Sequence, residues 1–188
     1  MTSSLTRRAR LFTGVAVAGA AVVVVSTATP VAFVASDGYS STGMNVVPGE
    51  TAVINVGLLR PAHPGSRVQL VSATVGGAGI DGRIGQLDGV RVYQVGPQGG
   101  IGAVNINDLS GIEGGPGWTL LEPNTAVITD QLPPWEAVVL VTGLTQGVWR
   151  ADYVDYEYRV DGRHGSQRVP IAATVCVVSS NEEPPCEI

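Results

Sequence analysis

Two cysteines, Cys176 and Cys186, are the side chains of this sequence best suited to covalent chemistry. They are its only cysteines, and an even number of cysteines in an oxidising compartment predicts a disulfide. The bridge would pin the C-terminal tail onto the preceding strand, and closing so short a loop stabilises a domain by about 2–3 kcal/mol. Two free thiols are the alternative. A catalytic thiol is not expected, because a nucleophile needs a base and histidine is scarce.

Metal-binding chemistry would have to use the two histidines, His63 and His164. A blue-copper site needs two histidines, a cysteine and usually a methionine, and only Met44, His63, His164 and Cys176 could supply that set. The compact spacing of cysteine and histidine in such sites is absent, and zinc would have too few ligands. We therefore predict no metal, and we expect both histidines in exposed turns.

Gly77, Gly79 and Gly82 match the spelling of the dinucleotide-binding fingerprint. That fingerprint requires a helix after the glycines, because the helix N-terminus holds the pyrophosphate. Here residues 83–89 (RIGQLDG) follow, and they are typical of a turn. We expect the glycines to serve turns with positive φ, and we predict no nucleotide.

Acid–base catalysis has no recognisable motif in this chain. Neither a nucleophile elbow, nor a Walker loop, nor a zinc-protease motif, nor a calcium loop is present. The carboxylate pair of a glycosidase would meet only in space, so the sequence does not show it. We predict that the protein is not an enzyme and has no cofactor, with a small secreted hydrolase or metal carrier as an alternative.

Three tryptophans, Trp118, Trp135 and Trp149, could form an aromatic binding surface. Core packing explains tryptophan equally well, and we expect it for at least two of the three. Trp135 follows two prolines and is the best candidate for exposure. Two coplanar exposed tryptophans would indicate a carbohydrate- or cell-wall-binding module.

The elements that would position these side chains are strands. Alternating patterns with turn signals between them predict strands at 51–58, 67–75, 89–95, 102–106, 118–121, 125–128, 137–142, 148–160 and 168–178. In the strand at 51–58, Leu58 is expected on the inward face. In the strand at 67–75, Val75 is expected on the face opposite to that of Val68 and Leu70. Residues 137–142 (AVVLVT) are apolar throughout, as in the middle of a sandwich.

Seven to nine strands without an amphipathic helix after residue 40 predict an all-β protein. The number and spacing of the strands favour an immunoglobulin-like β-sandwich, and a small closed barrel is the alternative.

The last two strands are expected to form a long hairpin, because Asp161-Gly162 is a turn signal between alternating runs. Val154, Tyr156, Tyr158 and Val160 would share the buried face, and Tyr153, Asp155, Glu157 and Arg159 the wet one. On the return strand Val169, Ile171, Ala173, Val175 and Val177 form an apolar face. Pro170 requires that this strand be unpaired on one side there.

The run Tyr156-x-Tyr158-x-Val160-x-Gly162, followed by an apolar strand that ends at Val175-Cys176-Val177, resembles exported immunoglobulin-like proteins of actinobacteria. The resemblance covers the last part of the chain. It implies a fold and a location outside the cytoplasm. It brings no activity and no catalytic residues.

The N-terminus has the pattern of an export signal. Arg7, Arg8 and Arg10 precede a stretch, residues 11–36, that has no charged residue. Cleavage after residues 34–36 and retention as a transmembrane anchor are both open, because about 20 apolar residues suffice to span a bilayer. Either outcome places residues 37–188 outside, since the arginines stay cytoplasmic. The general secretory route and the twin-arginine route also remain open.

Charge narrows the choice of partners. All 16 acidic residues follow residue 36, with eight of the 11 basic ones, which leaves a formal charge of −8 there. Such a domain repels phosphate backbones, so we predict no nucleic-acid partner. We expect a signal or anchor (1–36), a linker (37–43), a sandwich domain (44–178) and a tail (179–188). The expected function is a non-catalytic extracytoplasmic interaction or structural module that binds a protein partner or an envelope polymer, with membrane contact through the N-terminal segment if it is uncleaved.

Overall fold

The computed structural model describes residues 33–35, 42–95, 104–106, 119–122, 125–130 and 135–180. Within these residues the chain forms eleven strands and no helix. The strands are β1 (Phe33–Ala35), β2 (Thr42–Val46), β3 (Thr51–Pro61), β4 (Val68–Gly76), β5 (Gly85–Gln94), β6 (Val104–Ile106), β7 (Thr119–Leu121), β8 (Val127–Ile128), β9 (Trp135–Gly143), β10 (Gly147–Val160) and β11 (Arg163–Val177). The prediction of an all-β chain is confirmed, and the predicted number of seven to nine strands is too low.

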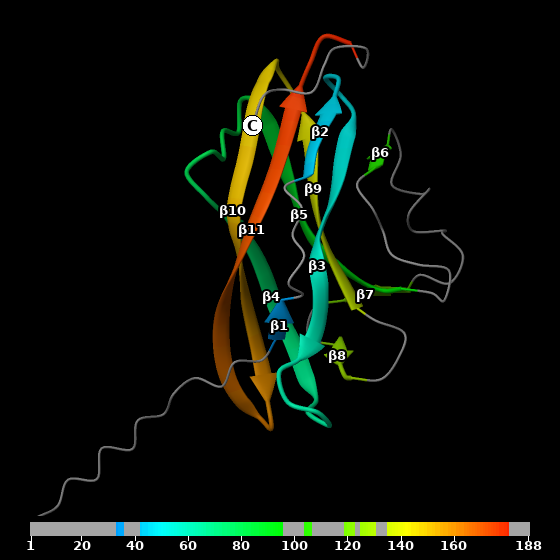
Figure 1. Ribbon diagram of the computed structural model, residues 1–188, viewed down its shortest axis with the longest axis vertical. Coiled ribbons are helices and arrows are strands. Elements are labelled where there is room, and N and C mark those ends of the chain that lie inside the picture. Colours follow the sequence, from blue (N-terminus) through cyan, green and yellow to red (C-terminus); the bar gives the residue numbers. More distant parts are fainter. Residues whose placement is uncertain are drawn as a thin grey trace, which may run out of the picture.

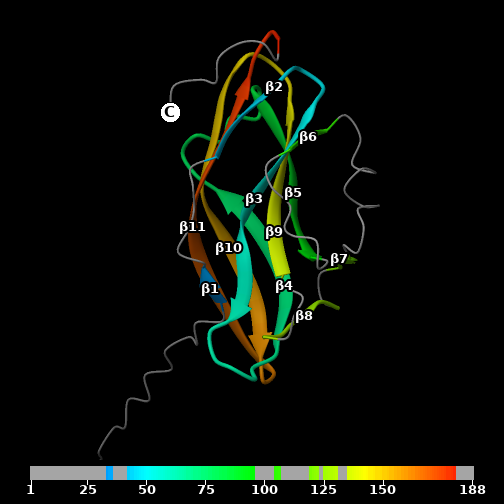
Figure 2. The same ribbon diagram turned by 45° about the vertical axis from the view of Figure 1, so that its right-hand side comes forward.

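The strands form two sheets that pack face to face (Figure 1). The first sheet has the order β1-β3-β9-β5-β7, with β6 also paired to β3, and the second has the order β2-β11-β10-β4-β8. The view in Figure 2 separates the two layers, with β9 and β5 in one and β10 and β11 in the other. A two-sheet sandwich therefore positions every side chain discussed below.

The two strands that the sequence pattern missed lie at the N-terminal end of the described chain. β1 falls within the expected export segment and pairs antiparallel with the end of β3. β2 begins at Thr42, within the expected linker, and pairs in parallel with β11. The chain therefore runs along the edge of one sheet and then along the edge of the other. No helix among the described residues is long and apolar enough to cross a membrane.

β9 is the centre of the first sheet, with β3 on one side and β5 on the other. Ala137, Val139 and Val141 face the second sheet and belong to the main core, which confirms the interpretation of this run as a central strand. Val138 and Leu140 belong to a second buried cluster with Val53 and Tyr93. A strand that is buried on both faces needs a continuous apolar run, and the sequence supplies one.

The β10–β11 hairpin forms around Asp161 and Gly162, whose φ angles are +50° and +76°. Two consecutive positive φ values are typical of a type I′ hairpin turn, which Asp-Gly favours. The return strand begins at Arg163 and not at residue 168, because this tight turn lets pairing start at once. The predicted faces are confirmed, since Tyr156 and Val175 are buried and Glu157 is exposed.

Two bulges change the faces that simple alternation predicts. Between Asn55 and Gly57 β3 has one residue more than β9, so Leu59 joins the core and Leu58 does not. A second bulge in β4, opposite the Glu157–Tyr158 step of β10, brings Val75 onto the core face together with Val68 and Leu70. Both expectations were wrong because an inserted residue inverts the alternation beyond it.

At Pro170, β11 has a neighbour on one side only among the described strands. β2 pairs with residues 173–177 of β11 and leaves 163–172 unpaired on that side, whereas β10 runs along the other. The missing amide proton of proline therefore removes no hydrogen bond between strands on the open side. This arrangement confirms the expectation for Pro170.

Candidate functional site

Core packing was expected for at least two of the three tryptophans, and the burial of Trp135 and Trp149 confirms it. Trp149 is 0% exposed and Trp135 is 7% exposed, and both belong to the main core. Trp149 lies opposite Val175 on β11, and Gly85 of the facing sheet leaves room for its indole. Trp118 lies outside the described residues. Trp135, the best candidate for exposure, is therefore not exposed, and a carbohydrate platform loses two of its three candidates.

Cys176 is buried near the end of β11, next to β2. Cys186 lies outside the described residues, so the disulfide stays a prediction. The position of Cys176 agrees with its expected role of anchoring the tail at the end of the last strand.

Among the described residues, the two histidines do not form a metal site with the other candidate ligands. His63 lies in the loop after β3, whereas His164 lies on β11 and not in a turn. The Nε2 atom of His164 accepts a hydrogen bond of 2.8 Å from Nε of Arg159. Within the described ranges, no three side chains of His, Cys, Asp or Glu come close enough together to hold a metal ion.

The glycine-rich loop after β4 packs against β10. Gly77 has a φ of +154°, and a side chain there would overlap the backbone and carboxylate of Asp152. The carboxylate of Asp152 accepts a hydrogen bond of 3.0 Å from the amide of Ala78, and the carbonyl of Gly79 accepts one of 3.0 Å from the amide of Arg150. Gly77 and Gly79 thus allow close approach to β10. Of the three glycines only Gly77 has a positive φ, so the expectation of positive-φ turns was wrong for Gly79 and Gly82. A turn at 82–84 follows, and β5 begins at Gly85, four residues before the expected start at residue 89.

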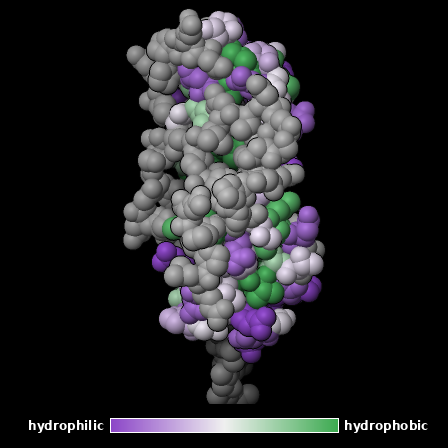
Figure 3. Space-filling model, turned by 90° about the vertical axis from the view of Figure 1, so that its right-hand side faces the viewer, coloured by the Kyte–Doolittle hydropathy of each residue, from purple (hydrophilic) through white to green (hydrophobic). Residues whose placement is uncertain are grey.

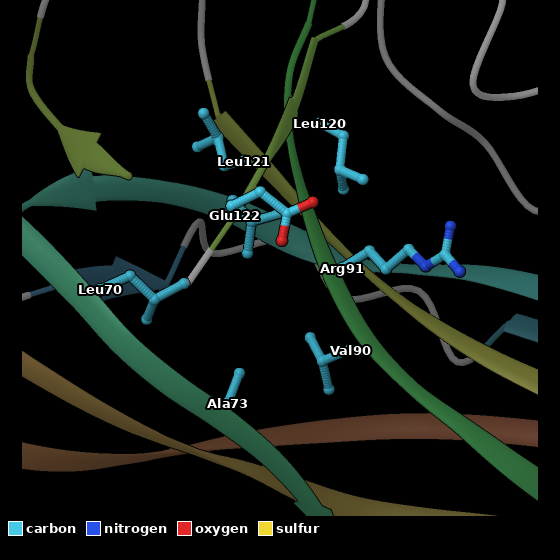
Figure 4. A pocket seen from close by; sticks show the side chains of 8 residues that line it. Leu70, Ala73, Val90, Arg91, Leu120, Leu121 and Glu122 are labelled. Carbon is cyan, nitrogen blue, oxygen red and sulfur yellow. The ribbon is translucent and has the colours of Figure 1, made fainter. Parts of the chain in front are cut away.

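A cleft of about 320 Å³ opens between the two sheets on the side that carries β7 and β8. It is lined by Leu70, Ala73, Val90, Arg91, Val92, Leu120, Leu121 and Glu122. These residues come from β4, from β5 and from β7 with the residue after it (Figure 4). On this side of the molecule apolar side chains reach the surface between polar ones (Figure 3).

The cleft exists because the strands that cover this side are short. β8 pairs only with Val68 and Gln69 of β4, and β7 pairs only with residues 92–94 of β5. Beyond the backbone hydrogen bond from Leu70 to Ala126, no described strand closes the sheets at this edge. The core side chain Leu70 and the half-buried Ala73 and Val90 therefore border an opening.

Two charged residues belong to the lining of the cleft. Glu122 is exposed and its carboxylate points into the space that the apolar side chains surround, whereas the guanidinium of Arg91 extends away from it (Figure 4). Among the described lining residues, the mouth of the cleft therefore presents a negative charge next to apolar side chains. The sequence pattern gave no signal for this site, because its lining comes from three separate segments and contains no motif.

The outer face of the second sheet carries a different polar arrangement. Arg168 donates two hydrogen bonds of 2.8 Å to the carboxylate of Asp155, and its guanidinium carbon lies 3.7 Å from the centroid of the Tyr153 ring. The hydrogen bonds from Arg168 lower the pKa of Asp155. Both partners are exposed, so the pair contributes little to stability. The contacts of Arg168 hold Asp155 and Tyr153 together on the solvent-exposed face of the hairpin.

One buried carboxylate escaped the sequence analysis. Glu136 on β9 is almost completely buried and accepts a hydrogen bond of 2.9 Å from Nδ2 of Asn55 on β3. It lies opposite Leu58 and Tyr93 in the sheet, on the face that carries the second apolar cluster. A charged residue at the start of an apolar strand gives no sequence signal that its side chain is buried.

A comparison with protein-family models finds no match for this chain, and a comparison with curated proteins finds none either.

Proposed function

We propose that the chain is a single immunoglobulin-like domain that acts outside the cytoplasm as a non-catalytic protein-binding module. The strand order supports the fold. Constant-type immunoglobulin domains pair strands A, B, E and D in one sheet and C, F and G in the other. Here β1, β3, β9 and β5 follow the first order, and β4, β10 and β11 follow the second.

The insertion between β5 and β9 distinguishes this chain from the simplest version of that fold. β6, β7 and β8 lie in it and add short pairings at the edges of both sheets. β7 also supplies Leu121 to the cleft. An insertion that helps to shape an opening is typical of loops that carry function on a rigid sandwich.

The cleft between β4, β5 and β7, in which apolar side chains lie beside polar groups, is the single observation that carries the proposed function. Its volume, about 320 Å³, is at the lower end of the range for ligand sites, roughly 300–1,000 Å³. Among the described lining residues, apolar side chains beside the carboxylate of Glu122 suit an aliphatic side chain that projects from a partner protein. The proposed binding module therefore uses this cleft.

The proposed location rests on the N-terminal pattern of arginines before an uncharged stretch. Because β1 pairs with β3 in the first sheet, only the part of this segment before Phe33 would be removed by a signal peptidase or hold the domain at the outer face of the membrane. The expected disulfide between Cys176 and Cys186 fits the same compartment.

Photo-cross-linking in cells that produce the full chain tests the proposal. A photoreactive phenylalanine analogue at Glu122, at the mouth of the cleft, should give an adduct with a discrete protein. The matched control carries the same analogue at Leu144, an apolar side chain that is 42% exposed in the loop between β9 and β10. Equal adducts from both positions, or none from Glu122, would contradict the proposed binding cleft.

A further inference from the structure

The edge of the second sheet beside the cleft is open. From Ser72 to Gly76, β4 pairs regularly with β10 on one side. On its other side β8 ends after pairing with Gln69, and no other described strand takes its place. The backbone groups that point away from β10 along this stretch, which we call the β4 edge (Ser72–Gly76), therefore have no neighbouring strand among the described residues.

Open edges are usually protected against pairing with other chains by charges, prolines or bulges. The open stretch of β11 carries Arg163, Arg168 and Pro170. The open stretch of β5 carries a bulge at Asp88, followed by Gly89 with a φ of +118°.

The β4 edge lacks these protections. Its sequence, Ser-Ala-Thr-Val-Gly, contains no charged residue and no proline, and its pairing with β10 is free of bulges. The bulge of this strand lies before Ser72. A regular, uncharged edge is a template for an added strand.

The cleft lies directly beside this edge. Ala73, in the middle of the edge, and Leu70, just before it, both line the cleft. When a peptide adds a strand to a sheet, backbone hydrogen bonds supply the affinity, and a pocket for alternate side chains supplies the specificity. The β4 edge and the cleft therefore supply both requirements in one place.

Charge indicates the chemistry of the added strand. Glu122 at the mouth is exposed, and the chain beyond residue 36 has a formal charge of −8. A second copy of this chain would bring another acidic domain to the same place, which like-charge repulsion disfavours. A segment with a basic residue next to its aliphatic residue complements both the mouth and the domain.

We propose that the β4 edge takes up an extended segment of a different protein as an added strand, with one aliphatic side chain in the cleft and an adjacent Lys or Arg beside Glu122. This inference rests on the proposed binding function and specifies how the partner is recognised. It differs from the proposed function in requiring backbone pairing with Ser72–Gly76.

The test uses the purified full chain in detergent and a displayed library of random linear peptides as the probe. Peptides selected on the protein should share an aliphatic residue next to a basic one. Hydrogen exchange should show that the amides of the β4 edge that do not bond to β10 become protected when a selected peptide binds. Glu122→Gln should weaken binding by about threefold, and the loss should shrink at high salt.

Two variants of β4 separate the cleft from the rest of the strand. Ala73→Phe places a ring in the cleft and should weaken binding by about tenfold or more. Thr74→Phe adds the same ring one residue along, at an exposed position on the opposite face, and should change binding by less than about twofold. Ala73→Val, a smaller change, should give an intermediate loss and guards against a failure of the larger variant to fold.

The other possible outcomes would refute strand addition, the binding cleft or the identity of the occupant. Peptides that are sensitive to Ala73→Phe but leave the β4 amides unprotected would refute strand addition and leave the binding cleft standing. Selection of no peptide, or of peptides indifferent to Ala73→Phe, would refute both. A dimer of the full chain that Ala73→Phe dissociates would show a second copy to be the occupant.

Discussion

Gly165 should tolerate a side chain poorly, and the reason is a single buried ring. It lies opposite Tyr158 in the β10–β11 hairpin. A Cβ atom at Gly165 would lie 2.6 Å from Cε2, 2.8 Å from Cζ and 2.9 Å from Oη of Tyr158. Ordinary carbon contacts are roughly 3.5–4.0 Å. Tyr158 is 0% exposed, so its ring has no solvent into which to move.

Overpacking of a buried site costs about 1–3 kcal/mol. We expect Gly165→Ala to fall near the upper end, at about 3 kcal/mol, because three ring atoms overlap and the ring is enclosed. The free energy of unfolding is obtained from urea titrations of the full chain, followed by tryptophan fluorescence, since Trp149 is buried in the core.

A double-mutant cycle isolates the cause. Tyr158→Leu removes the ring atoms that the new methyl group would meet, so Gly165→Ala should be nearly neutral in that background. The coupling free energy between the two positions should then be about 2 kcal/mol or more. An equal cost of Gly165→Ala with and without the Tyr158 ring would refute this reasoning.

Gly76→Ala is the matched control on the outer face of the same sheet. Its Cβ atom would meet the ring of Tyr153, which is half-buried and can turn into solvent. The cost should be about 1 kcal/mol, chiefly the loss of the Arg168 contact over that ring. The two substitutions therefore separate a ring that can move from one that cannot.

Three further predictions follow from burial, charge and compartment. Val175→Asp should unfold the domain or destabilise it by more than about 4 kcal/mol in urea titrations, because Val175 is 0% exposed. Glu157→Gln should change the free energy of unfolding by no more than about 0.5 kcal/mol, and a damaging Glu157→Gln with a tolerated Val175→Asp would invert the assigned faces. Hydrogen bonds from the side chain and the backbone amide of Arg83 lower the pKa of Asp81 from 3.8 to about 2, so the stability that this carboxylate contributes is present above pH 3.8 and is lost as the pH falls through about 2. Carboxyl chemical shifts should show this pKa, and Arg83→Gln should raise it only part of the way to 3.8, because the backbone amide of residue 83 remains a donor. Thiol titration of the native, air-purified chain should find no reactive thiol until a reductant is added, and two reactive groups would contradict the disulfide.

Local patterns in the sequence determined the class of the fold and its strongest elements. Alternation in residues 148–160 assigned Tyr156 inward and Glu157 outward, because side chains of a strand alternate between its faces. Asp161-Gly162 predicted the hairpin, since both positions need positive φ. The apolar run at 137–142 predicted a central strand, because only a strand covered on both faces remains apolar throughout.

The tertiary structure decided every feature that depends on the partner strand. The bulges that bring Leu59 and Val75 into the core are defined by register against β9 and β10, and a single strand pattern contains no register. Trp135 and Trp149 are buried because the facing sheet covers them. The composition around a tryptophan does not distinguish a core from a binding platform.

The candidate site is among the features that only the tertiary structure decided. Its lining joins Ala73, Val90 and Leu121, which lie on three strands of two different sheets. It opens because β8 ends after two residues, and the length of an edge strand depends on what the rest of the fold leaves uncovered. Residue types could therefore predict a sandwich with an apolar interior, whereas the place where that interior reaches the surface follows only from how the two sheets meet.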